Sequence, residues 1–208
     1  MTLRPEEIEA KSFEIIDSEV GTHPFPPDQW PIVRRAIHAT ADLDLVKVVR
    51  FHPEAVARGI EALRRGARIL VDVEMIRAGI NKKGLERLGG GAIECYISEP
   101  EVVEMAKKSG GTRAAAAMRW AKERLPGSIV AIGNAPTALL ELAQMIEEGA
   151  SPPALVVGVP VGFVSAAESK EKITETQVPY VIVSGRKGGS TVAVAMVNAL
   201  IKLALEEK

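Results

Sequence analysis

Short runs of β-branched residues alternate with longer stretches of helical periodicity along the chain, and this alternation constrains the fold more than any other feature. It is typical of βαβ units, in which helices join parallel strands. Most of the runs are apolar on both faces, as strands are when helices cover both sides of their sheet. We therefore expect a single α/β domain over residues 1–208, with a mostly parallel sheet between two layers of helices.

The expected strands share a short apolar run that ends near Gly, Pro or Asp, and they cover residues 46–51, 68–73, 93–97, 128–132, 154–159 and 180–184. The expected helices share a longer amphipathic pattern and cover 5–18, 27–39, 53–65, 99–107, 113–124, 135–148, 165–176 and 189–206. Pro5, Pro27 and Pro53 fall at or near first-turn positions. Gly66 and Gly149 follow the last turns of two of these helices.

Charge and composition exclude several classes of protein. The 26 Lys and Arg residues against 27 Asp and Glu give a net charge of -1, so there is no global field to attract nucleic acid or an anionic membrane. The longest apolar stretch, 154–161, is broken by Gly and Pro and is shorter than the ~20 residues of a membrane helix. A single cysteine, Cys95, and a start without an apolar signal segment lead us to expect a cytoplasmic protein. Because the histidines and Cys95 lack metal-ligand spacing, we expect no protein-bound metal.

Arg35 and His38 are three residues apart in the expected helix 27–39, so their side chains share one face. An imidazole titrates near neutral pH and acts as a proton donor when it reaches a pocket. The same position also fits a histidine near a helix end that only interacts with the helix dipole. The spacing alone leaves both interpretations open.

Residues 133–137 follow the expected strand 128–132 and open the next helix. This placement puts backbone N–H groups and the side chains of Asn134 and Thr137 at the carboxyl end of a strand, where open α/β sheets bind ligands. Alternatively, Asn134 only caps the helix, with Pro136 helping it to begin. The residues do not favour either interpretation.

Two later loops repeat this arrangement. After the expected strand 154–159, a Gly and Pro turn leads into a polar helix in which Lys170 could meet a ligand carboxylate, although a solvated helix with a local Glu168 and Lys170 pair fits the spacing better. The loop before the last helix places Arg186 and Lys187 beside two glycines and Ser190, which favours an anion clamp. Neither the phosphate-loop pattern nor the dinucleotide fingerprint occurs, so nucleotide binding has little support.

Ordered blocks connect these segments: 12–16 (SFEII), 35–39 (RAIHA), 72–76 (DVEMI), 133–139 (GNAPTAL), 160–164 (PVGFV) with 168–170 (ESK), and 188–190 (GGS). Taken in this order, they resemble the precorrin-8X methylmutase family over essentially the whole chain. The one departure is Ser165, where the family pattern has Gly.

The resemblance implies an isomerase of cobalamin biosynthesis that converts precorrin-8X or cobalt-precorrin-8 to hydrogenobyrinate or cobyrinate by shifting a methyl group from carbon eleven to carbon twelve of the macrocycle. It also implies a homodimer with the pocket near the subunit interface. Because the methyl shift can proceed within one molecule, we expect no cofactor. Carried over by motif, His38 is the catalytic acid, and Ser12 and Arg35 contact the substrate. The corrinoid carries several carboxylates, for which the candidate cations are Arg35, Arg113, Lys170, Arg186 and Lys187. Asn134, Thr137 and Ser190 complete the expected substrate-binding residues.

Two other functions remain open from the residues alone. The chain could be a non-catalytic carrier of tetrapyrrole acids, which would keep the arginines without needing His38. It could also be an unrelated doubly wound enzyme, such as a transferase that binds a phosphate ester at residues 188–190.

Overall fold

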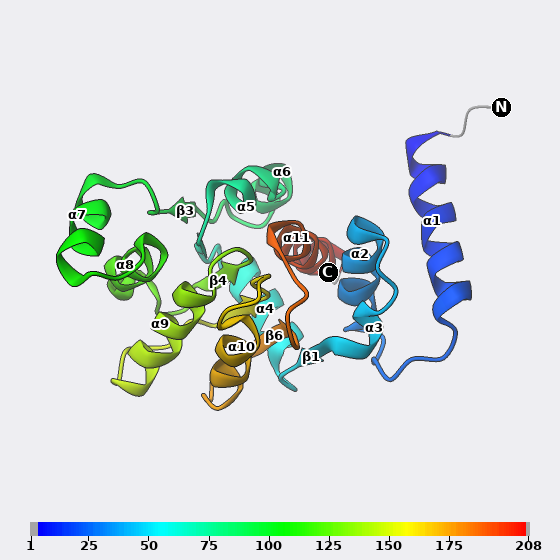
Figure 1. The fold of residues 1–208 in the computed structure, drawn as a ribbon. Coiled ribbons are helices and arrows are strands. Elements are labelled where there is room, and N and C mark those ends of the chain that lie inside the picture. The colour runs from blue at the N-terminus through cyan, green and yellow to red at the C-terminus, as the bar shows by residue number, and fades with distance from the viewer. Residues whose placement is uncertain (1–3, 207–208) are drawn as a thin grey trace.

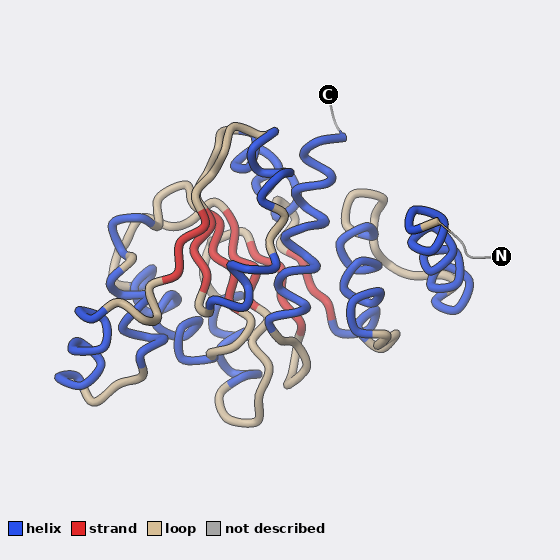
Figure 2. The backbone as a smooth tube through the Cα atoms, turned by 90° about the horizontal axis from the view of Figure 1, so that it is seen from above, coloured by secondary structure: helices blue, strands red, loops and turns tan. Residues whose placement is uncertain are grey.

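A six-stranded sheet lies at the centre of the computed structural model (Figures 1 and 2). The structure describes residues 4–206; for Pro5 and Glu6 it describes the backbone but not the side chains. Its strands are β1 (Val49–Phe51), β2 (Ile69–Val71), β3 (Ile93–Cys95), β4 (Ile129–Ile132), β5 (Leu155–Gly158) and β6 (Tyr180–Val183). They lie in the order β1-β6-β5-β4-β2-β3. Every neighbouring pair is parallel except β1 with β6 at one edge. The predicted α/β fold with a mostly parallel sheet is confirmed.

Helices cover both faces of this sheet (Figure 2). One layer contains α2 (Trp30–Thr40), α4 (Ala55–Arg64), α5 (Glu74–Gly79), α6 (Lys82–Arg87) and α11 (Ser190–Glu206). The other contains α8 (Arg113–Trp120), α9 (Pro136–Glu147) and α10 (Ala166–Thr174), with α7 (Pro100–Ser109) packed on α8 and a short 3₁₀ turn at Lys122–Arg124. Helix α1 (Pro5–Val20) packs on the outer side of α2 and lies at one end of the molecule (Figure 1). Among the described residues, no helix has the length and hydropathy of a membrane span.

The strand sequences explain why two layers are needed. Ile69 and Val71 of β2 point to the layer with α11, while Leu70 between them points to the layer with α9. All four residues of β4 are fully buried. Burying one such side chain contributes about 1.5 to 3 kcal/mol, so a strand apolar on both faces is stable only between two helical layers.

Two parts of the expected secondary structure are wrong. Residues 46–48, expected as the start of a strand, belong to the helical turn α3 (Leu45–Val48), because the Asp42 carboxylate accepts the Asp44 N–H at 3.1 Å and starts a turn. Helices α5 and α6 fall in a region where no helix is expected. Each has six residues, which is too short to show a helical period. The ends of the expected domain, residues 1–3 and 207–208, lie outside the described residues.

The loops after β4, β5 and β6 interlock at the carboxyl edge of the sheet. Val159 O accepts the Gly189 N–H at 2.8 Å, and Arg186 O accepts the Gly162 N–H at 3.2 Å. Gly188 has a φ of +149°, and a Cβ atom there would lie 2.1 Å from Val159 O. Only glycine fits at this position, and the contact sets where α11 begins.

Gly188→Ala is therefore expected to lower the free energy of unfolding by at least about 3 kcal/mol, because backbone strain and a clash with Val159 O add together. Gly149→Ala is the matched control, since Gly149 has a φ of +90° but open space around the new methyl group. It should cost only about 1 kcal/mol. Urea unfolding of both variants measures the difference, and equal losses would show that the close approach at Gly188 is not important.

Candidate functional site

A groove of about 530 Å³ runs along the outward face of α11. One wall is α2, which contributes Arg35 and His38, and the other is the α5–α6 region, which contributes Asn81 and Arg87. The floor is one helical face of α11, made of Thr191, Val194, Ala195, Asn198, Lys202 and Leu205. The shared face expected for Arg35 and His38 thus opens into a hollow with further cations.

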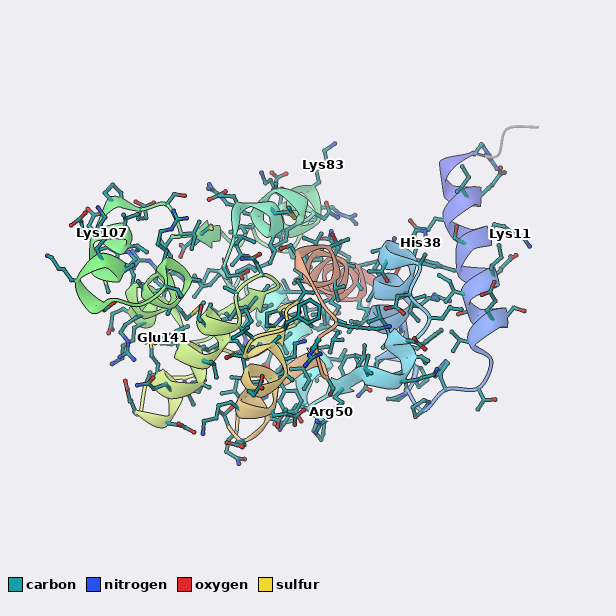
Figure 3. All side chains as sticks on the ribbon, viewed as in Figure 1. Lys11, His38, Arg50, Lys83, Lys107 and Glu141 are labelled. Carbon is teal, nitrogen blue, oxygen red and sulfur yellow. The ribbon has the colours of Figure 1, made fainter. Side chains whose placement is uncertain are left out.

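His38 is exposed and lies on α2, the helix between α1 and α11 (Figures 1 and 3). Its ring meets the ring of Phe13 on α1 edge-on, with centroids 5.3 Å apart. The guanidinium carbons of Arg34 and Arg35 lie 4.4 and 4.9 Å from the centroid of the same Phe13 ring. Phe13 therefore limits the orientation of the imidazole ring while leaving it accessible to solvent. A proton donor to a bound molecule must be accessible in this way.

Arg35 is already paired. Its guanidinium donates to the Glu9 carboxylate of α1 at 2.7 Å, and Lys202 lies 4.0 Å from the same carboxylate oxygen. The hydrogen bond from Arg35 holds the pKa of Glu9 below its usual value. Glu9 was not singled out from the sequence, because its partners are 26 or more residues away.

Ser12, the expected substrate contact on α1, donates its hydroxyl to Ile8 O at 2.8 Å. It lies on a flank of α1 between Ile8 and Ile15, which are 51% and 47% exposed. The opposite side of α1, with Phe13 and Ile16, packs on α2. The Ser12 flank is thus an apolar surface that the described part of the chain leaves uncovered.

An asparagine pair missed by sequence reasoning shapes the far wall of the groove. Asn198 of α11 accepts the Asn81 N–H at 2.8 Å and donates to Gly79 O at 3.0 Å. The Asn81 side chain in turn accepts the Gly84 N–H and caps α6. The only sequence signal was Asn81 before a helix former, which does not reveal the contact with α11.

A second group of expected residues lies at the carboxyl edge of the sheet. Asp72, 2% exposed, accepts the N–H groups of Gly133, Asn134 and Ala135 at 3.1, 2.9 and 2.7 Å. Of the two interpretations left open, binding of a ligand by these backbone amides does not fit the structure, because Asp72 already accepts all three N–H groups. Burial raises the pKa of Asp72, and the three hydrogen bonds oppose that rise.

The side chains around this turn nevertheless face outward. Asn134 is exposed, and the hydroxyls of Thr137 and Thr112 are hydrogen-bonded at 2.8 Å. Thr112 caps α8, so the exposed Arg113 comes directly after it. Asn134, Thr137 and Arg113 are thus neighbours on the chain's surface, but none of them lines the His38 groove.

The expected exposure of Lys170 on a solvated helix is wrong. It is completely buried, and its ammonium donates to Gly185 O at 2.8 Å and Lys187 O at 2.7 Å. Burial lowers its pKa to about 8. Lys170 thus holds the loop before α11 instead of facing a ligand.

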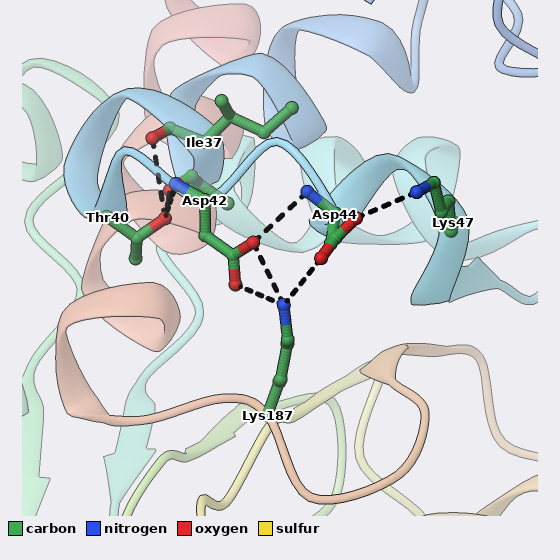
Figure 4. Close-up of polar contacts among 7 residues, drawn as sticks. Ile37, Thr40, Asp42, Asp44, Lys47 and Lys187 are labelled. Atoms are coloured by element: carbon green, nitrogen blue, oxygen red, sulfur yellow. Dashed lines mark hydrogen bonds and ion pairs between the residues drawn. The ribbon is translucent and has the colours of Figure 1, made fainter.

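Lys187 and Arg186 do not form the expected clamp either. The Lys187 ammonium lies 2.8 Å from Asp42 and 3.3 Å from Asp44, which ties the loop to the end of α2 (Figure 4). The Arg186 guanidinium lies 5.5 Å from the centroid of the Phe163 ring, which is 85% exposed. Ser190 begins α11, one residue before Thr191 of the groove. The loop therefore connects the carboxyl edge of the sheet to the His38 groove. It does not itself present a pair of free cations.

Without its edge strand β1, the sheet has the order β3-β2-β4-β5-β6, which defines a doubly wound α/β protein of flavodoxin-like strand order. The comparisons then identify the family. A family model described as precorrin-8X methylmutase matches residues 7–203. The chain belongs to the precorrin-8X methylmutase family, whose members are methyl-shifting isomerases of cobalamin biosynthesis.

Relatives agree over nearly the whole chain. A cobalt-precorrin-8 methylmutase of Priestia megaterium is 52% identical over 204 residues, which cover 98% of this chain and 90% of that protein. A precorrin-8X methylmutase of Pseudomonas aeruginosa is 45% identical and is matched over 91% of each protein. A solved precorrin-8X methylmutase structure from Thermus thermophilus superposes with a TM-score of 0.89 at 49% identity and covers 96% of each chain.

The buried ammonium of Lys170 gives a pH prediction. Between pH 8 and the ordinary lysine pKa near 10.5, the unfolded chain binds more protons at this residue than the folded chain does. The stability from this group is therefore present above about pH 10.5 and lost as the pH falls through about 8. The test is urea unfolding of wild type and Lys170→Met at pH 7, 8.5 and 9.5. The free energy of unfolding of wild type should increase relative to that of Lys170→Met as the pH rises.

Lys172→Met on the same helix is the control. Its exposed ammonium pairs with Glu147 and Glu175, and these contacts raise its pKa. As the pH rises, the free energy of unfolding of wild type should stay constant or decrease relative to that of Lys172→Met. A Lys170→Met difference that does not change with pH would show that the ammonium is not desolvated.

Proposed function

We propose that this chain shifts a methyl group from carbon eleven to carbon twelve of precorrin-8X or its cobalt form in the groove between α2 and α11, with His38 as the proton donor. The observation that carries the proposal is the groove itself. An accessible imidazole and the cations Arg35, Arg87 and Lys202 line one hollow, and none of the described residues lining it carries a carboxylate.

The proposed chemistry needs one acid. The methyl group leaves one ring carbon and bonds to its neighbour within the same molecule, so no group is gained or lost. Protonation of the conjugated ring by His38 makes the ring electron-poor and favours this migration. The proton returns to His38 when the product forms. A histidine suits this step because its ordinary pKa lies near neutral pH.

The cations of the groove suit the rest of the substrate. A corrinoid acid carries acetate and propionate groups around an apolar ring, and arginines bind carboxylates with two parallel hydrogen bonds. Val194, Ala195 and Leu205 supply apolar surface for the ring between these cations. A cobalt ion held by the macrocycle needs no protein ligand, so this geometry accepts either form of the substrate.

We also propose that the chain works as a homodimer in the cytoplasm, with the groove near the interface between subunits. Arg113 lies on α8, on the opposite layer of the sheet from α2, and does not line the His38 groove of its own chain. A second copy could bring its Arg113 to that groove and cover exposed apolar residues such as Ile8, Ile15, Phe163 and Val164. The methylmutase relatives do not favour the alternative of a non-catalytic carrier.

His38→Asn tests the proton donor. Asparagine keeps the approximate shape and hydrogen bonding but cannot transfer the proton. Single-turnover conversion of precorrin-8X, followed by absorbance, should slow by about a hundred to ten thousand fold while corrinoid affinity changes little.

His52→Asn, which replaces a histidine outside the groove, should leave the single-turnover rate unchanged. If His38 only packs on Phe13, its replacement costs about 1 kcal/mol of stability and the folded fraction keeps its rate. A near-normal rate in His38→Asn would therefore contradict its role as acid.

Mixing two variants tests the shared site. Separately, His38→Asn should lose kcat/KM by about a hundredfold or more, and Arg113→Ala by about tenfold or more. If each site takes His38 from one subunit and Arg113 from the other, a mixed dimer has one intact site, and random exchange restores about a quarter of wild-type kcat/KM. Activity no higher than the average of the two separate preparations would contradict the shared site, and a light-scattering mass of 22.2 kDa would contradict the dimer.

A further inference from the structure

Helix α1 brings one carboxylate to a groove whose own lining is cationic. Glu9 Oε1 lies 2.7 Å from Arg35 Nη2 and 4.0 Å from Lys202 Nζ, and both of these cations line the groove. The Glu9 side chain is 41% exposed and that of Arg35 is 23% exposed. The pair thus lies at the rim, where an entering molecule can reach it.

The environment keeps Glu9 ionised. The hydrogen bond from Arg35 lowers its pKa most, burial opposes this, and the positive charges of Arg35 and Lys202 lower the pKa further. Asp17, which is also on α1, lies against Arg34 Nη1 at 2.6 Å and accepts the Trp30 indole N–H at 3.0 Å, and none of these residues lines the groove. Glu9 is therefore the acidic residue of the described part of α1 that interacts with the groove cations.

One Glu9 carboxylate oxygen lies beside Arg35 and Lys202, two of the cations to which the proposed function assigns the carboxylates of the substrate. We infer that Glu9 is an internal competitor for the carboxylates of the corrinoid, and that it sets the affinity of the groove for its acidic substrate and product. This inference rests on the proposed function of the groove.

Such a competitor acts in two ways. An entering carboxylate must take the place of Glu9 on Arg35 or remain beside a like charge, and either outcome weakens binding. When the product leaves, Glu9 pairs again with Arg35, so the cations are not left unpaired. Glu9 thus limits how tightly an acid with many carboxylates is held, while the contact of Asp17 with Arg34 and Trp30 keeps α1 on α2.

The test is a titration of the purified protein with hydrogenobyrinate, followed by absorbance at low ionic strength. Glu9→Gln should bind it about two to five times more tightly than wild type, because an exposed ion pair of this kind is worth no more than that ratio. The gain should shrink in 0.5 M salt, where the Debye length is about 4 Å.

Asp17→Asn is the matched control, because it removes the same charge from the same helix and loosens α1 on α2 without freeing Arg35. It should bind hydrogenobyrinate as wild type does. Equal tightening in both variants would overturn the inference, because loosening of α1 would then be the cause. Unchanged or weaker binding by Glu9→Gln would also overturn it, by showing that Glu9 orients Arg35 or does nothing. If wild type itself fails to bind hydrogenobyrinate, the proposed function fails and the inference falls with it.

Discussion

The packing of α11 against both the sheet and α2 holds the groove in place. Its buried face includes Ala193, Val197 and Leu200, which are at most 1% exposed. At Gly79 a Cβ atom would lie 2.8 Å from Val194, so glycine lets the end of α5 approach α11 closely. Because interiors are close-packed, the outward face of α11 cannot rotate without disturbing both neighbours. The packing of α11 therefore sets where the residues of the groove floor lie.

The polar contacts fix details of this frame. Within residues 4–206 Lys170 pairs with no carboxylate, and its two hydrogen bonds go to partly buried carbonyls of the loop before α11. Leaving a buried donor such as this ammonium without partners costs about 1 to 3 kcal/mol or more. The exposed pairs of Lys187 with Asp42 and Asp44 contribute at most about 1 kcal/mol each, so they orient the end of α2 more than they stabilise it. His38 is thus positioned mainly by packing and by Phe13.

The sequence predicts the parts of this arrangement that depend on local pattern. Runs apolar on both faces predict β2, β4 and β5, and the three-residue spacing of Arg35 and His38 places them on one face. Asp72 could not be predicted to use the amides of residues 133–135, because it lies 61 to 63 residues away along the chain.

The same limit applies to the rest of the site. Lys170 lies among charged neighbours that predict an exposed helix, and only the path of a loop 15 residues later explains its burial. The opposite wall of the groove comes from two short helices without a visible period. The resemblance implies Ser12 as a substrate contact, and the carboxylates of the expected substrate suggest Arg113 as another, although the structure places the two residues on different sides of the sheet.

The central claim is that the corrinoid lies between α2 and α11 with His38 against its ring. A crystal structure of the protein with hydrogenobyrinate bound tests this most directly. The account predicts the macrocycle over the outward face of α11, a His38 ring nitrogen within about 3 Å of a macrocycle atom, and a carboxylate on Arg35. A macrocycle bound elsewhere, for example beside Asn134 and Thr137 with His38 facing only water, would contradict it.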